Sequence, residues 1–292
     1  MNRARVVAVG FLLALLHALA GAAAAQERSM LPVTIDGESV KLAVITYKPP
    51  GDGPFPVLIF HHGSTGSGTD PKAFARPFDP FVLAHWFVAR GWAVVLPSRR
   101  GRGGSEGLYD EGFDEDRTRG YTCDETRALA GAERALADID AASAAILAWP
   151  FIDRTRFIVG GQSRGGILSI AWAGRHPDEP RGVVNFVGGW SGAHCQTAVN
   201  QRLFKMGATF PRQTLWLYGD RDFFYPLSYS SENFASFVAA GGRGTFQTFE
   251  PLGGVGIGHL IYRDDSLWSP TMDAYLAETG LPHDRREQVL RQ

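Results

Sequence analysis

The sequence carries almost no net charge, and charges of one sign do not form a long run. Its 29 lysines and arginines nearly balance its 30 aspartates and glutamates, which gives a formal charge of −1 at pH 7. A protein that binds nucleic acid through its phosphates needs a basic excess or a basic patch. We therefore expect no nucleic-acid partner.

The chain after Ala25 also lacks a long hydrophobic run, so we expect no membrane span there. Before it, Arg3 and Arg5 precede a nearly continuous apolar run over residues 6–20, and small residues follow up to Gln26. This arrangement is typical of a secretory signal peptide, with a membrane anchor as the alternative. We expect cleavage of residues 1–25, a single domain over residues 26–292, and a periplasmic or secreted protein.

Cysteine is scarce: only Cys123 and Cys195 are present. Both fall in the part of the chain that we expect to be exported, where an oxidising environment favours a disulfide. Both also follow predicted strands, at the same edge of the predicted sheet. We predict a Cys123–Cys195 disulfide, and two separate thiols are the alternative.

Internal repeats and linkers are absent, and short apolar runs of β type alternate with helical patterns. The expected strands span residues 31–35, 40–47, 57–60, 93–96, 157–159, 183–187, 215–218 and 246–249, and the expected helices 81–88, 126–149, 167–175, 232–240 and 267–276. The first two strands form an antiparallel pair around Asp36-Gly37. The remainder predicts an α/β protein with a mostly parallel sheet and helices on both faces. Residues 99–121, rich in Gly, Arg and Asp, are expected to form a long surface loop.

The segment Gly161–Gly165 matches the pattern G-x-S-x-G. A nucleophile at this position needs a strand before it and a helix after it, and Ser163 lies between two such predicted elements. Glycine is required on both sides because a side chain would collide with the neighbouring strand and helix. A second match, around Ser105, has no strand directly before it and is interpreted as a turn. We therefore predict that Ser163 is a nucleophile and that the Arg164 amide stabilises an oxyanion.

A serine hydroxyl needs a base, and the base needs an orienting acid. Of the histidines after Ser163, His259 alone follows the last predicted strand, behind a glycine-rich loop. Asp220 and Asp222 both follow the strand 215–218. We predict His259 as the base and Asp222 as the acid, with Asp220 as the alternative.

The loop after strand 57–60 is the expected source of a second oxyanion donor. His61-His62-Gly63-Ser64 resembles the H-G-x element of such loops, so the Ser64 amide is the candidate. A metal site at His61 and His62 is not supported, because no carboxylate or cysteine stands at ligand spacing beside them. We expect neither a metal nor a cofactor.

Together, these segments resemble the α/β-hydrolase superfamily. The matching segments are His62-Gly63-Ser64, Arg100-Gly101-x-Gly103-x-Ser105, Gly161-x-Ser163-x-Gly165, Gly219-x-x-Asp222 and Gly258-His259. Within the superfamily the chain is similar to the dienelactone-hydrolase-like group and to the catalytic domain of prolyl-oligopeptidase-like peptidases. The resemblance implies the α/β-hydrolase fold, and too few residues separate Trp190 from Leu215 for a large cap domain. Dienelactone hydrolases proper use cysteine where this chain has Ser163, which favours general esterase chemistry.

An arginine directly after the nucleophile also resembles glucuronoyl esterases, where that side chain helps to hold the oxyanion. We assign three residues to the mouth of the substrate site: His62, Arg100 and Trp190. A further hypothesis is that a group of arginines at this mouth binds an acidic substrate, namely Arg99, Arg100, Arg102 and Arg164. The alternative is that Arg100 holds a turn and that Arg164 is buried in an ion pair.

The sequence thus predicts an exported serine hydrolase that cleaves a small-molecule carboxylic ester through an acyl-enzyme. The alternatives are a serine peptidase of prolyl-oligopeptidase-like type and a uronoyl- or feruloyl-type carbohydrate esterase. A non-catalytic binding protein is disfavoured by the intact Ser163, Asp222 and His259. A dinucleotide enzyme is disfavoured because no G-x-G-x-x-G follows the first parallel strand.

Overall fold

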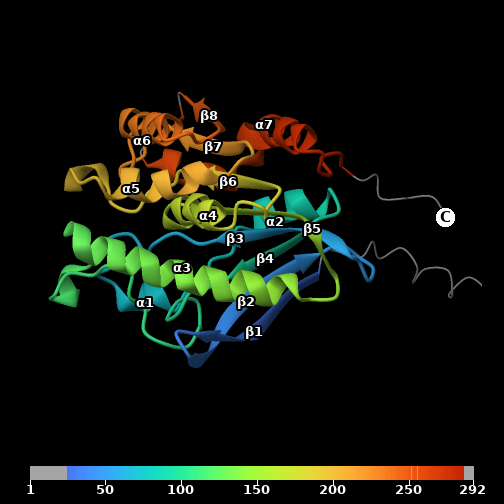
Figure 1. The fold of residues 1–292 in the computed structure, drawn as a ribbon, viewed down its shortest axis with the longest axis horizontal. Helices are drawn as coiled ribbons and strands as arrows, with labels where there is room; N and C mark the ends of the chain where they lie inside the picture. The colour runs from blue at the N-terminus through green and yellow to red at the C-terminus, as the bar shows by residue number, and fades with distance from the viewer. Residues whose placement is uncertain (1–24, 251, 255, 286–292) are drawn as a thin grey trace, which may run out of the picture.

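The computed structural model describes residues 25–250, 252–254 and 256–285. The predicted signal peptide lies outside the described residues except for Ala25. One eight-stranded sheet organises the chain, in the order β1-β2-β4-β3-β5-β6-β7-β8 (Figure 1). The strands are β1 (Ala25–Ile35), β2 (Glu38–Lys48), β3 (Phe55–His61), β4 (Ala93–Pro97), β5 (Ile152–Gln162), β6 (Gly182–Phe186), β7 (Thr214–Gly219) and β8 (Gly244–Phe249).

The sheet is antiparallel only at its first edge. β1 pairs with β2 around Asp36 and Gly37, which both have positive φ (53° and 83°), as a two-residue hairpin of this twist requires. β2 pairs antiparallel with β4, and the pairs from β4 through β3 to β8 are parallel. This confirms the predicted mostly parallel sheet.

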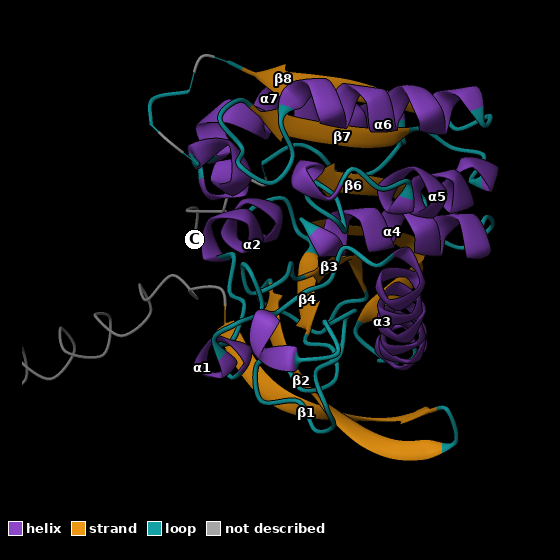
Figure 2. Cartoon of the chain, turned by 90° about the vertical axis from the view of Figure 1, so that its left-hand side faces the viewer, coloured by secondary structure: helices purple, strands orange, loops and turns teal. Residues whose placement is uncertain are grey.

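Helices cover both faces of the sheet. They are α1 (Pro71–Phe74), α2 (Phe81–Val88), α3 (Glu125–Leu147), α4 (Arg164–Arg175), α5 (Val199–Met206), α6 (Leu227–Ala239) and α7 (Asp265–Glu278), with short 3-10 turns η1 (Arg117–Arg119), η2 (Ala193–Cys195), η3 (Gly207–Thr209) and η4 (Ile257–Arg263). α3, α4, α5 and α6 follow one another along one face, and α2 and α7 lie on the other (Figures 1 and 2). Among the described residues, we find no helix with the length and apolarity that crossing a membrane requires.

The centre of the core is the strand-turn-helix unit of β5 and α4. All seven residues of β3 are buried, as are residues 157–162 of β5 and residues 164–173 of α4. An element that is apolar on all sides must be covered on all sides, which is why helices lie on both faces here. Between β6 and β7 the chain forms only η2, α5 and η3, in agreement with the expected absence of a large cap domain.

Three sequence-based expectations need correction. β5 begins at Ile152 rather than at Phe157, because its first part is polar and partly exposed and so lacks an apolar pattern. Helices α1 and α5 were not expected, and α1 has only four residues. The segment 99–121 is not simply a surface loop: several of its polar and aromatic side chains are buried, and they pair with one another and with α3 and α4. These buried side chains are Arg99, Arg100, Arg102, Tyr109, Glu111 and Phe113.

Candidate active site

Ser163 occupies a strained turn between β5 and α4. Its φ is 56° and its ψ is −122°, a conformation that L-residues with a side chain rarely adopt. The surroundings fix this turn: the Ser163 amide donates to Phe186 O (3.0 Å), and its carbonyl accepts from the amides of Gly166 (2.9 Å) and Gly189 (3.2 Å). Such a turn presents the serine side chain at the end of the strand while the backbone stays paired.

The glycines on both sides of Ser163 are required because a side chain would not fit at either position. A Cβ on Gly161 would lie 2.3 Å from the carbonyl carbon of Gly165, and a Cβ on Gly165 would lie 2.0 Å from His61 O. The second copy of the pattern has a different role. The Ser105 hydroxyl donates to Ser98 O (2.7 Å) and accepts from the Ala43 amide (2.8 Å), so it serves as a turn residue.

Asp222 and His259 form a hydrogen-bonded pair beyond the ends of β7 and β8. Asp222 Oδ2 lies 2.8 Å from His259 Nδ1, and the Asp222 side chain is fully buried. Its other oxygen accepts from the amides of Phe224 (2.8 Å) and Tyr225 (3.1 Å). Both oxygens are thus satisfied, the imidazole is held by Nδ1, and its Nε2 is left for proton transfer.

Asp220 does not take this role. Its Oδ1 accepts from the Leu252 amide (2.9 Å) and its Oδ2 lies 3.8 Å from Arg221 Nε. The geometry therefore favours Asp222 as the orienting acid and leaves Asp220 to hold the turn after β7.

A hydrogen bond from the neighbouring Gln162, and not one from Ser163 itself, connects the Ser163 turn to His259 in the described part of the chain. Gln162 Nε2, one residue before the nucleophile, donates to His259 O (3.2 Å). The hydrogen bonds of the described residues include none between the Ser163 hydroxyl and His259. Catalytic hydrogen bonds are often long in unliganded enzymes and shorten when substrate binds.

Tyr225 lies beside both groups and was missed by the sequence analysis. Its ring centroid is 5.7 Å from that of His259, and a Cβ on Gly189, whose amide binds Ser163 O, would meet the Tyr225 ring at 2.4 Å. Burial raises the pKa of the Tyr225 phenol well above its ordinary value, against the opposing effects of the Arg164 charge and hydrogen bonding with Ser163. The phenol is therefore a neutral hydroxyl donor next to the nucleophile. The sequence offered one signal for Tyr225, namely its position three residues after the predicted acid Asp222.

The predicted oxyanion donors belong to two segments that meet at Ser163. A Cβ on Gly63 would lie 2.8 Å from Ser163 Cβ, so the loop that carries Ser64 runs directly against the nucleophile. Arg164 is the first residue of α4, and a helix provides no acceptor for its first amides. Both amides remain the candidates for this role.

The predicted mouth residues are buried rather than open. His62 Nε2 accepts from the Arg99 amide (3.0 Å) and its Nδ1 donates to Gly63 O (2.8 Å), so both ring nitrogens bind the protein. Arg100 binds Asp138 on α3 through Nε (2.5 Å) and through its amide (2.8 Å). Trp190 is 2% exposed. Long-range pairing thus holds the His62 and Arg100 side chains in the interior, and the assignment of His62, Arg100 and Trp190 to a substrate mouth stays a prediction.

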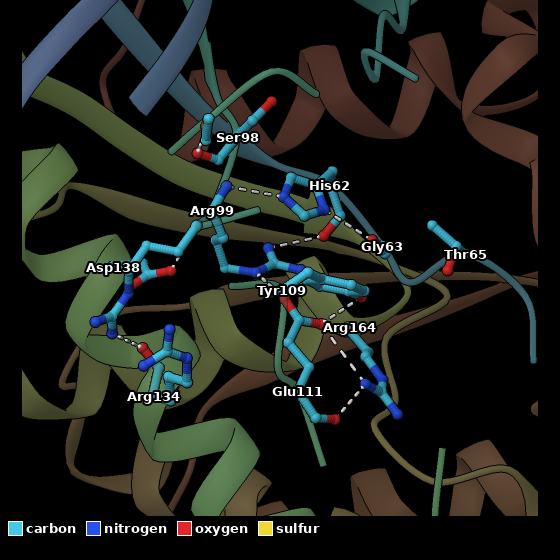
Figure 3. A network of polar contacts seen from close by, with 12 residues as sticks. His62, Gly63, Thr65, Ser98, Arg99, Tyr109, Glu111, Arg134, Asp138 and Arg164 are labelled. Atoms are coloured by element: carbon cyan, nitrogen blue, oxygen red, sulfur yellow. Dashed lines mark hydrogen bonds and ion pairs between the residues drawn. The ribbon is translucent and has the colours of Figure 1, made fainter. Parts of the chain in front are cut away.

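Arg164 is buried in an ion pair, as the alternative hypothesis stated. Its Nη1 donates to Glu111 O (2.6 Å) and lies 3.6 Å from Glu111 Oε2 (Figure 3). Its guanidinium carbon stands 3.8 Å from the Tyr121 ring centroid and 4.2 Å from that of Trp190. The side chain is thus held between two aromatic rings, an arrangement that stabilises a cation.

Glu111 connects this arginine to the loop beside the nucleophile. It binds Arg99 Nε (2.5 Å), and Arg99 Nη1 donates to His62 O (2.9 Å) (Figure 3). It also accepts from the Tyr109 hydroxyl (3.0 Å). Burial favours the neutral acid, but the charge and hydrogen bond of Arg99, together with the charges of Arg164 and Arg102, outweigh it and keep the pKa of Glu111 below its ordinary value. A charged Glu111 therefore holds the 62–65 loop in place through Arg99.

The predicted disulfide is confirmed: Cys123 and Cys195 are bonded, with their Cα atoms 5.2 Å apart. It joins two segments that flank Arg164. One segment carries Tyr121, whose hydroxyl also accepts from the Thr65 amide (3.2 Å), and the other carries Trp190. The crosslink therefore restrains the two rings that enclose the arginine next to Ser163.

Comparisons with known proteins agree with the fold. The model of the X-Pro dipeptidyl-peptidase (S15) family matches residues 36–125, which do not include Ser163, Asp222 or His259. No curated protein matches the sequence at a significant level. Solved structures match over most of the chain.

Three of these structures illustrate the range of matches. Est1E from Butyrivibrio proteoclasticus, solved with ferulic acid, has a TM-score of 0.59 and 15% identity, over 85% of this chain and 98% of its own. Acylaminoacyl peptidase from Pyrococcus horikoshii has a TM-score of 0.60 and 16% identity, over 91% of this chain and 43% of its own. A protein from Klebsiella pneumoniae described as a dienelactone hydrolase has a TM-score of 0.54 and 15% identity, over 88% and 99%. At such identities the similarity concerns the fold.

Proposed function

We propose that this chain, which has the α/β-hydrolase fold, is a serine hydrolase that cleaves carboxylic esters with Ser163, His259 and Asp222. The observation that carries the proposal is the Asp222–His259 pair, with 2.8 Å between Oδ2 and Nδ1, at the same sheet edge as a serine on a strained strand-to-helix turn. The three residues are far apart in sequence and all follow strands at the edge of the sheet where ligands bind in open α/β folds. Hydrolase neighbours of the same fold support the proposal.

The geometry supports a two-step reaction. His259 Nε2 takes the proton of the Ser163 hydroxyl as its oxygen attacks the ester carbonyl, and buried Asp222 stabilises the imidazolium that forms. In this mechanism, the amides of Ser64 and Arg164 stabilise the negative charge that develops on the carbonyl oxygen. The imidazolium then protonates the departing alcohol, which leaves an acyl-enzyme. A water attacks this ester, gives its proton to His259, and releases the acid and the free serine.

A peptidase is the second candidate function. The observation that favours it is the match of residues 36–125 to the S15 peptidase family model, together with the fold shared with an acylaminoacyl peptidase. An amide has a poorer leaving group than an ester, so the two candidates are separated by comparing ester substrates with fluorogenic peptides. Dominant peptide cleavage would replace the esterase proposal.

Export is the remaining part of the proposal. The disulfide supports it, because such bonds persist in oxidising compartments and are rare in the cytosol. Mass spectrometry of the mature protein tests it, with an N-terminus at Gln26 as the expected result. A chain that retains residues 1–25 in the cytosol would contradict it.

Ser163→Ala is the test of the catalytic assignment. We expect it to reduce the turnover of short p-nitrophenyl esters by about 10⁴-fold or more, and to abolish labelling by a fluorophosphonate. Ser105→Ala is the matched control, since Ser105 occupies the other copy of the same sequence pattern. Unchanged turnover in Ser163→Ala, or loss of labelling only in Ser105→Ala, would overturn the assignment.

A further inference from the structure

Arg102 is a buried cation without a partner of opposite charge. The residue is 5% exposed, and its Nε and Nη1 are buried without any hydrogen-bond partner. Among the ion pairs of the residues that the structure describes, none includes Arg102. Its guanidinium carbon lies 5.2 Å from the centroid of the Tyr109 ring, which offers only a weak attraction. A buried guanidinium normally has its donors bound to a carboxylate or to backbone carbonyls.

The surroundings do not supply the missing charge. Four arginines lie together in this part of the interior: Arg99, Arg100, Arg102 and Arg164. Only two buried carboxylates face them, Asp138 paired with Arg100 and Glu111 shared between Arg99 and Arg164. Two positive charges are thus left without a buried counter-charge. Burying an unpaired ion is costly, so a compensating group is expected.

A second set of free donors lies in the same cluster. Arg99 Nη2 is buried and has no hydrogen-bond partner, although Arg99 Nε and Nη1 are both bound. Arg99 and Arg102 both act on His62, whose pKa lies well below its ordinary value because of burial and then of these two charges. The charges of Arg99 and Arg102 also lower the pKa of Glu111. Contacts connect both side chains to Tyr109: the Arg102 guanidinium carbon lies 5.2 Å from its ring centroid, and Arg99 binds Glu111, which accepts from the Tyr109 hydroxyl.

We propose that Arg102, together with the free Nη2 of Arg99, binds a small monoanion in the interior of the protein. Planar guanidinium donors suit a halide or a carboxylate, and either would neutralise the unpaired charge. The anion has two candidate sources, an inorganic ion from solution or a carboxylate on the substrate. In the second case the inference rests on the proposed esterase function, and it names the substrate class as esters that bear an acidic group.

The first experiment measures anion binding without catalysis. The protein carries Ser163→Ala, so no turnover enters the measurement, and its Tm is followed as chloride, bromide or acetate is added at constant ionic strength. We expect little change in Tm below Kd and a rise of about 3 °C for each tenfold increase in anion concentration above Kd. Arg102→Gln is expected to remove this rise. In the absence of anion, the Tm of Arg102→Gln should equal or exceed that of the parent protein, because the unpaired charge is gone.

The matched control is Arg119→Gln, which removes the same charge from a side chain that is 73% exposed. It should keep the anion-dependent rise. An equal rise in the parent protein, Arg102→Gln and Arg119→Gln would show a general salt effect and overturn the site. If Arg102→Gln does not fold, a crystal of the Ser163→Ala protein soaked in bromide replaces it. An anomalous peak against Arg102 supports the site, and a peak elsewhere only, or none, overturns it.

The second experiment identifies the source. Active protein is assayed with an ester of a dicarboxylic acid monoanion and with its neutral methyl analogue. A preference for the acidic over the neutral ester that falls at least tenfold in Arg102→Gln assigns the site to a substrate carboxylate. Equal rates, with a Tm response to halide, assign it to an inorganic ion. No Tm response and no acidic preference overturn the site, whereas a protein that hydrolyses neither ester but responds to halide refutes only the esterase proposal.

Discussion

At the scale of single residues, two pairs of chemically identical side chains take different roles because they have different contacts. Asp220 and Asp222 stand two positions apart after the same strand, yet only Asp222 is bound to an imidazole. Ser105 and Ser163 share a sequence pattern, yet only Ser163 lies on a strained turn before a helix. The role of each side chain therefore follows from its hydrogen-bond partners and its backbone conformation, and not from its residue type.

Replacing the acid tests this distinction. Asp222→Asn keeps the shape but disfavours the imidazole tautomer that donates through Nδ1, so we expect kcat to fall by about 10³-fold or more. Asp220→Asn still offers an oxygen to the Leu252 amide and should keep kcat within a few-fold. Steady-state kinetics on one activated ester provides the measurement. A larger loss in Asp220→Asn than in Asp222→Asn would reverse the assignment.

His61 couples stability to pH. Burial, and then the nearby Arg99 charge, lower its pKa from 6.5 to about 3, and neither ring nitrogen has a partner. Between these values the unfolded chain is protonated and the folded protein is not. The free energy of unfolding is therefore highest above pH 6.5 and falls as the pH decreases toward 3.

His61→Phe should make that dependence shallower by about 1.4 kcal/mol per pH unit below pH 6. It removes two unpartnered nitrogens, so we expect the variant to fold. The exposed His194 gives the control His194→Phe, whose pH dependence should match the parent protein. Urea denaturation at several pH values measures the effect, and an unchanged slope in His61→Phe would contradict it.

At the scale of elements, the β5–α4 turn is the unit that positions the nucleophile. The chain reverses within one residue, and the backbones of β3 and α4 approach so closely that a methyl group does not fit between them. The unit is buried on all sides, so the strain at Ser163 is held by packing and by four backbone hydrogen bonds.

Gly165→Ala tests the close approach. Its Cβ would lie 2.0 Å from His61 O, a backbone atom that cannot move aside, so we expect a loss of about 2–4 kcal/mol in the free energy of unfolding. Activity should fall as well, because the displaced strand carries the oxyanion loop. Gly253→Ala is the control, since nothing lies within 4 Å of a Cβ there. Equal stability of the two variants in urea denaturation would refute the argument.

At the scale of the whole molecule, a disulfide and a buried polar network fasten the segments around the site. Cys123 and Cys195 are 72 positions apart and lie near Tyr121 and Trp190, which enclose Arg164. The network from Glu111 through Arg99 reaches the loop after β3. Segments from four parts of the chain thus depend on one another for their position.

Removing the crosslink should weaken both stability and the site. On the chain-entropy model, a loop of this length contributes about 4 kcal/mol, so a Cys123→Ala, Cys195→Ala double variant should lose a comparable amount. We also expect kcat to fall, because the two rings beside Arg164 lose a restraint. A reducing agent should lower the Tm of the parent protein and leave the double variant unchanged. Equal Tm values for the two proteins would contradict the prediction.

The sequence by itself determined the features that local chemistry imposes. Apolar runs of strand length with helices between them require a covered parallel sheet, and glycines around a serine are required wherever a strand turns sharply into a helix. For that reason the sheet, the turn at Ser163 and the strand before Asp222 could all be predicted. The disulfide was predictable because both cysteines follow strands at one edge.

Only the tertiary structure decided which polar groups are paired. Arg99 pairs with Glu111 and Arg100 pairs with Asp138, partners 12 and 38 positions away, and these contacts hold both arginines in a buried network. Tyr225 likewise comes from another strand end and packs against Gly189, whose amide binds Ser163 O. Such pairings depend on the packing of distant segments, and no local pattern encodes them. The three-dimensional arrangement therefore decided what surrounds Ser163, whereas the sequence had already determined that Ser163 stands on a turn between a strand and a helix.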